Sequence, residues 1–243
     1  MQNNFLPILI LNARPGAGKS EIIDYLQHLP PEERRGDYHV GELDIIDDFP
    51  MLWTWFEEDA ILERMGYPRL HTDADGYFKT PYLWHLLIER ISLEYQKRLR
   101  DFPNYHHRYT TVIEFSRGTE HGGYTAAYQH LSDLILSRAT AFYVKVSYEE
   151  SLRKNRARFN PDRPDSILEH GLSDEKLERL YRQDDWERFS AGDPAYLSIK
   201  EHTVPYVVFE NEDDVTTARG PALGERLEET LALLWERYRA RPL

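Results

Sequence analysis

A glycine-rich loop near the start of the chain carries the residue types best suited to chemistry. Residues 13–20 read Ala-Arg-Pro-Gly-Ala-Gly-Lys-Ser and separate an apolar run from an amphipathic one. Backbone N–H groups at a helix N-terminus bind phosphate oxygens, and glycine lets the chain approach them closely. The loop therefore predicts a binding site for a nucleoside triphosphate, formed by Arg14, Pro15, Gly16, Ala17, Gly18, Lys19 and Ser20.

Two side chains of this loop have expected roles of their own. Lys19 is long enough to reach the β- and γ-phosphates, and the Ser20 hydroxyl is placed to ligate Mg²⁺. Ala13 occupies the position of the first glycine in the pattern GxxxxGK[ST], so the match is incomplete. The alternative is an ordinary glycine turn before a helix, but the apolar run before the loop and the helical run after it favour a phosphate loop.

Composition narrows the class of protein. The 30 basic and 42 acidic residues give a formal charge of −12, which repels nucleic acids and acidic membranes and suits a small anionic substrate in a basic pocket. The absence of cysteine excludes disulfides, thiol catalysis and zinc–cysteine sites. The first 15 residues show neither a basic leader nor a long apolar run, so we expect a cytoplasmic protein. The composition leaves the oligomeric state open, a homodimer included.

Apolar runs and amphipathic runs alternate along the chain, which predicts an α/β fold with parallel strands. We expect five strands, at residues 7–12, 38–45, 110–115, 141–146 and 205–209. We expect helices at residues 19–28, 52–65, 82–100, 124–137, 148–158 and 223–239. One domain, residues 1–243, would then carry an acceptor-side insertion at about 46–109 and a lid at about 159–203. In such sheets ligands bind at the carboxyl ends of the strands.

With Pro15-Gly16-Ala17-Gly18-Lys19-Ser20 after the first strand and a basic helix after the fourth, the chain resembles the P-loop kinases of nucleosides, nucleotides and other small molecules. The resemblance implies the P-loop NTPase fold, with five parallel strands in the order 2-3-1-4-5 between helices. It also implies ATP and Mg²⁺ as cofactors, an acid after the second or third strand, and lid arginines that clamp the transferred phosphoryl group.

Charged residues lie at the end of the third expected strand and just after it. Glu114 resembles the family's acid, which orients Mg²⁺ through water or accepts the proton of the substrate hydroxyl. Arg117, three residues later, resembles a contact to the acceptor or to a phosphate. The alternative is a structural Glu–Arg ion pair at the rim of the sheet.

The second expected strand also ends in carboxylates. Asp44 is the first candidate for the base that binds the acceptor hydroxyl, and Asp47 is the second, since related kinases hold the acceptor with a carboxylate there. The alternative is a solvated acidic turn that caps the next helix, for which Asp48 before Pro50 is suitable. Both interpretations stay open at this stage.

Basic residues cluster after the fourth expected strand. Arg153, Arg156 and Arg158 lie on one expected helix, with Arg163 in the loop beyond. Guanidinium groups match the geometry of a phosphoryl group in transfer, so these arginines are expected to be catalytic. The alternative is a basic helix face paired with Glu149 and Glu150. After the fifth expected strand, Asn211 stands where related kinases line the nucleotide site.

Aromatic residues cluster between Phe49 and Trp84, in a chain with five Trp and 16 Tyr. Packing in the core is the ordinary explanation for such a cluster. The more specific interpretation is that these rings stack on a flat acceptor molecule. The sequence thus predicts a kinase that transfers the γ-phosphoryl group of ATP to a small molecule, with nucleosides or nucleotides as the first choice. The alternative is a regulatory P-loop NTPase without an acceptor, and a polynucleotide kinase is disfavoured by the acidic charge.

Overall fold

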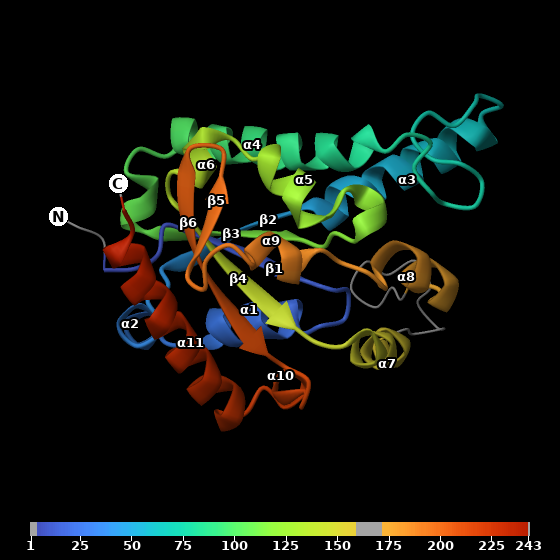
Figure 1. Cartoon of the computed structure of the whole chain (residues 1–243). Helices are drawn as coiled ribbons and strands as arrows, with labels where there is room; N and C mark the ends of the chain where they lie inside the picture. Colours follow the sequence, from blue (N-terminus) through green and yellow to red (C-terminus); the bar gives the residue numbers. More distant parts are fainter. Residues whose placement is uncertain (1–3, 159–171, 243) are drawn as a thin grey trace.

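A mixed β-sheet, parallel in all but one strand pair, organises the computed structural model, which describes residues 4–158 and 172–242. Its strands lie in the order β2-β3-β1-β4-β6-β5 (Figure 1). β5 runs antiparallel to β6, and every other neighbouring pair is parallel. The strands are β1 (Ile8–Ala13), β2 (Glu42–Asp47), β3 (Tyr109–Phe115), β4 (Ala139–Lys145), β5 (Tyr196–Ile199) and β6 (His202–Glu210).

The predicted sheet of five parallel strands in the order 2-3-1-4-5 is wrong, because the described residues form a sixth strand at one edge. β5 pairs with the start of β6 through a turn at Lys200 and Glu201. Lys200 has a φ of 52°, which a tight hairpin turn requires, but Lys-Glu lacks the Asn-Gly or Asp-Gly signature of such turns. The five strands that the sequence predicted lie side by side as β2-β3-β1-β4-β6.

Two layers of helices cover the sheet. The helices of the described residues are α1 (Lys19–His28), α2 (Pro31–Gly36), α3 (Asp48–Arg64), α4 (Tyr82–Asp101), α5 (Gly123–Gln129), α6 (Asp133–Leu136), α7 (Tyr148–Arg158), α8 (Asp174–Tyr181), α9 (Trp186–Ser190), α10 (Val215–Ala218) and α11 (Pro221–Ala240), with short 3-10 helices at Tyr105–His107 and Thr119–His121. Helices α4, α5, α6 and α9 share one apolar core with the sheet, and α1 and α11 share the other.

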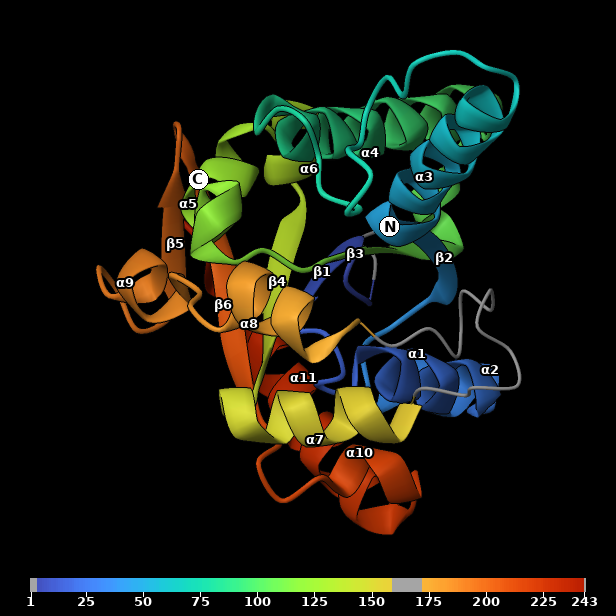
Figure 2. The same ribbon diagram turned by 90° about the vertical axis from the view of Figure 1, so that its right-hand side faces the viewer.

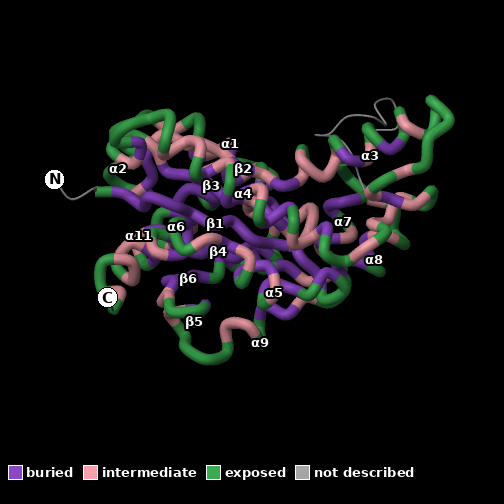
Figure 3. Tube along the Cα trace, turned by 90° about the horizontal axis from the view of Figure 1, so that it is seen from above, coloured by how far each residue is buried: buried purple, intermediate pink, exposed green. Residues whose placement is uncertain are grey.

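β1 shows why the sheet is buried on both faces. All six of its residues are buried, and their side chains alternate between the two cores. Ile8 and Ile10 belong to the core with α4, whereas Leu9 and Leu11 belong to the core with α1. Figure 3 shows the strands as the buried centre of the molecule.

Two predicted helices differ from the structure by more than two residues. The helix expected at residues 52–65 begins at Asp48, because the Asp47 side chain caps its first turn by accepting from the N–H of Phe49 at 2.9 Å. The helix expected at residues 124–137 is divided into α5 and α6. Ser132 lies between them, and its N–H donates to Ser92 Oγ at 3.0 Å instead of continuing the helix.

The segment between β2 and β3 projects beyond the carboxyl ends of the strands. It consists mainly of α3, α4 and the loop that joins them, and Figure 1 shows that loop on the same side of the molecule as α8. In the view of Figure 2, α8 lies between α3 and α4 above and α7 below. The segment therefore stands where a substrate at the strand ends would meet it. In the part of the chain that the structure describes, no helix is long and apolar enough to span a membrane.

Candidate active site

The loop between β1 and α1 has the backbone geometry of an anion cradle. Gly16 and Gly18 have φ values of 73° and 110°, which side chains other than glycine adopt only with strain. A Cβ at Gly18 would lie 2.5 Å from Thr216 Oγ1, so this position also lacks space. The loop leads directly into Lys19, the first residue of α1. Its N–H groups are thus those of a helix N-terminus, where the backbone favours a negative charge.

Neighbouring elements hold this loop from several sides. The hydroxyl of Tyr124 donates to the carbonyl of Ala13 at 3.1 Å, and Ser151 Oγ donates to the carbonyl of Pro15 at 2.7 Å. Asn211 Nδ2 donates to the carbonyl of Ala17 at 2.9 Å. Each of these bonds uses a carbonyl and none occupies an N–H group of the loop, in which the N–H of Ala17 donates to the carbonyl of Arg14 at 3.3 Å.

Lys19 extends from the loop toward the end of β3. Its Nζ donates to Ser116 Oγ at 2.9 Å and lies 3.7 Å from Glu114 Oε1. The side chain is buried, with a relative exposure of 8%. A buried ammonium group beside a loop with the geometry of an anion cradle is suited to contact the anionic end of a ligand.

Asp47 and Glu114 bring two carboxylates together next to Lys19. They are register partners on the neighbouring strands β2 and β3, one at the last residue of its strand and the other at the last but one. Burial, followed by the charge of Glu114, raises the pKa of Asp47 to about 8. Burial also raises the pKa of Glu114, and Lys19 opposes this effect. Each carboxylate therefore disfavours the charge of the other, and a cation bound beside them would favour their ionised forms.

A buried ion pair fixes the surroundings of these carboxylates. Arg117 Nη1 lies 2.6 Å from Asp48 Oδ2, and both side chains are almost fully buried. The guanidinium group also donates to the carbonyl of Trp84 at 3.2 Å. Loss of one partner would leave a buried charge alone, so the pair ties the start of α3 and the N-terminal part of α4 to the end of β3.

A cavity of about 780 Å³ lies over the strand ends. It is bounded by the phosphate loop, the ends of β2 and β3, the segment with α3 and α4, α7 and α8. Its charged lining residues are Lys19, Glu21, Asp47, Asp48, Lys79, Glu114, Arg117, Glu120, Arg158, Lys176 and Arg179. A cavity of this size accommodates a drug-sized ligand beside the phosphate loop.

One wall of the cavity is aromatic. Its rings come from Phe49, Trp53, Phe56, Tyr77, Phe78, Trp84, Phe115 and Tyr181. Phe78 packs edge-on against Trp84 at 4.7 Å between centroids, and Trp84 stacks on His121 at 3.8 Å. The aromatic cluster noted in the sequence thus packs against itself and also faces the cavity, so it is suited to bind a flat or apolar body.

Seven side chains of the sequence-predicted site converge on this cavity. They come from the phosphate loop, the strand ends and α7, and are Pro15, Gly16, Gly18, Lys19, Ser20, Asp47, Glu114, Arg117 and Arg158, with the two glycines contributing backbone alone. Ala17 is buried inside the loop. Ser20 is exposed within the cavity. The structure therefore assembles the phosphate loop with one carboxylate from each of two strands.

The structure does not bring Asp44 to the cavity. Asp44 Oδ2 accepts from Arg98 Nε at 2.9 Å and from the hydroxyl of Tyr105 at 2.6 Å. It lies three residues before the end of β2, too early in the strand to reach the cavity at its carboxyl edge. Asp47, the second candidate, occupies that position.

Two residues expected at the nucleotide hold the loop from outside the cavity. Arg14 forms an ion pair with Asp184 at 2.9 Å and donates to the carbonyl of Val146 at 3.0 Å. Asn211 is fully buried behind the loop and also donates to Thr216 Oγ1 at 2.9 Å. Both side chains support the loop, so they would affect a bound nucleotide only through the position of the loop.

The three arginines of α7 have different surroundings. Arg153 lies 2.6 Å from both Glu150 and Asp214, and Arg156 lies 2.5 Å from Asp174. Neither of them lines the cavity, whereas Arg158 does. The expected position Arg163, like the first part of the expected lid, lies outside the described residues.

No group of three or more His, Asp or Glu side chains within residues 4–158 and 172–242 could hold a metal ion alone. Ser20 and Glu114 do supply hydroxyl and carboxylate oxygens to the same cavity. Mg²⁺ keeps several waters and binds substrate phosphates through one or two protein oxygens. The donor set therefore fits Mg²⁺ only when it arrives with a nucleotide.

Sequence reasoning missed several residues of the cavity. Ser116 and His121 follow the acid of β3 closely, and proximity to that strand end was the available signal. Lys79 and Lys176 lie far apart in the chain, and no local pattern marks them. Only the packing of α8 near the loop after α3 brings them to one cavity.

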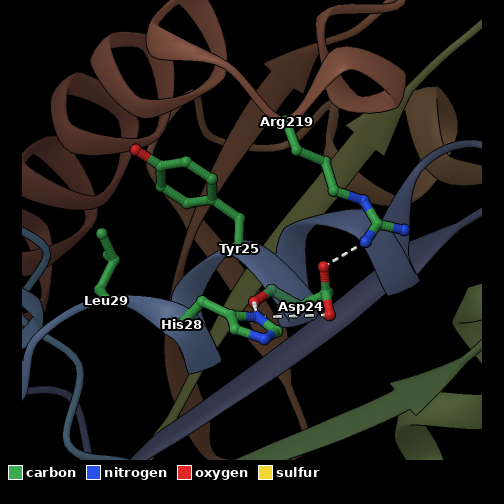
Figure 4. Close-up of a pocket in the computed structure, with 5 residues that line it drawn as sticks. All are labelled: Asp24, Tyr25, His28, Leu29 and Arg219. Carbon is green, nitrogen blue, oxygen red and sulfur yellow. Dashed lines mark hydrogen bonds and ion pairs between the residues drawn. The ribbon is translucent and has the colours of Figure 1, made fainter.

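A second hollow, of about 510 Å³, lies on the far half of α1 (Figure 4). Asp24 lies between His28, at 3.4 Å, and Arg219, with which it forms an ion pair. Tyr25 and Leu29 complete the lining. These contacts tie α1 to the end of α10, and the hollow contains no residue of the phosphate loop.

Comparisons with known proteins are limited to structures. No protein-family model matches the chain, and no curated protein matches it. The crystal structure of APE1195 is similar at 16% identity and a TM-score of 0.42, over 98% of this chain and 97% of the other. Shikimate kinase from Acinetobacter baumannii, in complex with shikimate, is similar at 16% identity and a TM-score of 0.33, over 72% and 75%. Both TM-scores are below 0.5, and a likeness of that size does not establish a shared function.

Proposed function

We propose that the chain is a P-loop kinase that transfers the γ-phosphoryl group of ATP to a hydroxyl of a small molecule, with a nucleoside or nucleotide as the first choice of acceptor. One observation carries the proposal. The phosphate loop with Lys19, the carboxylate pair Asp47 and Glu114, and an aromatic wall line one cavity. In the proposed kinase these groups would be the donor site, the base and the acceptor site, next to one another.

The residues of the cavity have distinct proposed roles. Backbone N–H groups at Gly16 to Ser20 bind the donor phosphates, and Lys19 contacts the β- and γ-phosphates. Ser20 and Glu114 would hold Mg²⁺, which when bound shields the charge of the transferred phosphoryl group. Arg158 contacts the same group from α7.

The carboxylate pair receives the proton of the acceptor. As the new O–P bond forms, the bond from the γ-phosphorus to ADP breaks and the hydroxyl proton passes to a carboxylate. Asp47 is favoured for this role because Phe49, two residues later, already belongs to the aromatic wall. The proposed site of action is the cytoplasm.

The rival function is that of a regulatory NTPase without an acceptor. Such a protein needs only the phosphate loop and a water molecule to hydrolyse a nucleotide. Hydrolysis does not require a cavity of about 780 Å³ with an aromatic wall. The cavity therefore supports the kinase.

The deciding experiment measures ADP release with ATP and Mg²⁺, with and without each member of a panel of nucleosides, nucleoside monophosphates, sugars and amino sugars. We expect at least one acceptor to raise the rate, and Lys19→Ala to lower turnover or ATP affinity by about tenfold or more. Lys97→Gln, on α4 outside the cavity, is the control. ADP release that is the same with every acceptor and without any would leave the regulatory NTPase.

A further inference from the structure

Most of the charged groups around the cavity are already paired. Lys19 lies next to Glu114, and Arg117 lies 2.6 Å from Asp48. Arg179 Nη2 lies 2.9 Å from Glu120 Oε1. These cations are neutralised by the protein itself, so they do not by themselves define the charge of the acceptor.

Two lysines of the cavity differ from these. Within residues 4–158 and 172–242, neither Lys79 nor Lys176 has a carboxylate within ion-pair distance. Lys79 Nζ donates to the carbonyl of Arg69, and Lys176 Nζ lies 5.3 Å from the centre of the Tyr77 ring. Both residues line the cavity, one from the loop after α3 and one from α8. The lining therefore includes two lysines whose charge no described carboxylate neutralises.

Lys176 is held close to the opposite wall. A Cβ at Gly76 would lie 2.5 Å from Lys176 Nζ and 3.4 Å from a ring carbon of Phe56. Arg179 also lies over the Tyr77 ring, at 4.1 Å from its centre. The loop after α3 and α8 thus meet at Tyr77, and the lysine ammonium group is positioned where they meet.

A continuous row of contacts connects the carboxylates with Lys176. Arg117, the partner of Asp48, lies 5.2 Å from the Trp84 ring, and Trp84 packs against Phe78. Phe78 in turn lies 5.9 Å from Phe56, which adjoins Gly76 and Lys176. The contacts therefore run from the carboxylates, along the rings of the wall, to Lys176, which has no carboxylate partner among the described residues.

We propose that Lys79 and Lys176 form an anion subsite, and that the acceptor is a flat or aromatic molecule that carries a carboxylate or a phosphate monoester away from the hydroxyl that is phosphorylated. The substrate class rests on the proposed kinase function. The anion subsite itself does not, since it is defined by the cavity alone. Charge and shape would together orient the acceptor, with its hydroxyl at Asp47 and its anionic group at the lysines.

Fluorescence of the cavity tryptophans tests the subsite without any catalytic assay. The probes are 2-naphthoate, 2-naphthyl phosphate and the neutral 2-naphthylmethanol, titrated into the wild type at low ionic strength. We expect at least one anion to bind about tenfold more tightly than the alcohol, and the difference to shrink as salt is added. The anion that binds more tightly identifies the carboxylate or the phosphate.

The variants Lys79→Gln and Lys176→Gln should each reduce this preference to about threefold or less, and leave the affinity of 2-naphthylmethanol unchanged. Lys97→Gln is the matched control and should behave as the wild type. Equal binding of anion and alcohol by the wild type, a preference that survives in both variants, or no binding of either anion at about 10 mM would overturn the subsite. Anion preference in a protein that shows no acceptor-dependent ADP release would support the subsite and reject the kinase.

Discussion

Asp47 and Glu114 are direct neighbours across β2 and β3, and each is the carboxylate nearest the carboxyl end of its strand. The phosphate loop follows β1, which pairs with β3 on the other side. Parallel strands bring their carboxyl ends to one edge, so two carboxylates and Lys19 meet although about 95 residues separate Lys19 from Glu114. This meeting point is where the proposed transfer takes place.

Asp47→Asn should change how stability depends on pH. The pKa of Asp47 is about 8 in the folded chain and about 4 in an unfolded one. Between these values only the unfolded chain releases the proton, so this group lowers the stability of the wild type as pH rises. Asparagine keeps the cap on Phe49 and does not titrate. We therefore expect the melting temperature of Asp47→Asn, relative to that of the wild type, to rise between about pH 5 and about pH 8.

The measurement is a set of thermal melts of both proteins across that range. Glu58→Gln, an exposed carboxylate on α3, is the control and should follow the wild type. A constant difference between wild type and Asp47→Asn at every pH would contradict the raised pKa.

Glu114→Gln should change the dependence on Mg²⁺. The amide keeps the shape and one acceptor oxygen, but it loses the charge that attracts the ion and the partner of Lys19 at 3.7 Å. We expect about tenfold more Mg²⁺ to be needed for half-maximal turnover, with little change in fold. Acceptor-dependent ADP release titrated with Mg²⁺ measures this, and superimposable titrations would remove the metal role.

The arginines of α7 should differ from one another in their effect on turnover. Arg158 lines the cavity, so Arg158→Ala should lower kcat by about tenfold or more while ATP affinity changes less. Arg153 and Arg156 are exposed and paired with carboxylates outside the cavity. Their alanine variants should stay within about twofold of the wild type, since exposed ion pairs contribute under about 1 kcal/mol. Equal losses of kcat in all three variants would count against the placement of Arg158.

Asp59→Asn should loosen the loop that carries Tyr77 and Lys79. The fully buried Asp59 carboxylate accepts from the N–H groups of Leu70, His71 and Thr72 and from Thr72 Oγ1. Burial raises the pKa of Asp59, but these hydrogen bonds lower it by a larger amount, so the pKa is about 2. We expect a loss of about 2 kcal/mol, because an amide places a second donor among these donors.

The pH dependence of that loss has a definite sign. Asp59 stabilises the fold fully above its unfolded pKa of about 4, and this stabilisation is lost as pH falls toward about 2. Denaturant unfolding of wild type and Asp59→Asn should thus show a difference in unfolding free energy that narrows in acid. Faster hydrogen exchange of the amides of residues 70–72 would locate the effect. Glu58→Gln again serves as the control, and unchanged exchange in Asp59→Asn would refute the role of the carboxylate.

Local patterns in the sequence were sufficient to predict a glycine-rich loop between a strand and a helix, and the alternation of strands and helices. Gly16, Gly18 and Lys19 are contiguous, and their chemistry depends on the few residues around them. The same holds for β1, whose apolar residues specify a buried strand without knowledge of its neighbours. Glu114 and Asp47 also could be named, because a carboxylate at a strand end is a local signal.

Tertiary structure decided the rest, because side-chain contacts depend on which elements pack together. Asp44 and Asp47 are both carboxylates near the end of β2. Only the tertiary structure shows that Arg98 and Tyr105 donate hydrogen bonds to Asp44, which gives this residue a structural role. Lys79 and Lys176 lie 97 positions apart in the sequence and become neighbours of one cavity through the packing of the loop after α3 near α8. β5 forms because it can pair with the edge of β6, and no pattern within the four residues of β5 predicts that pairing.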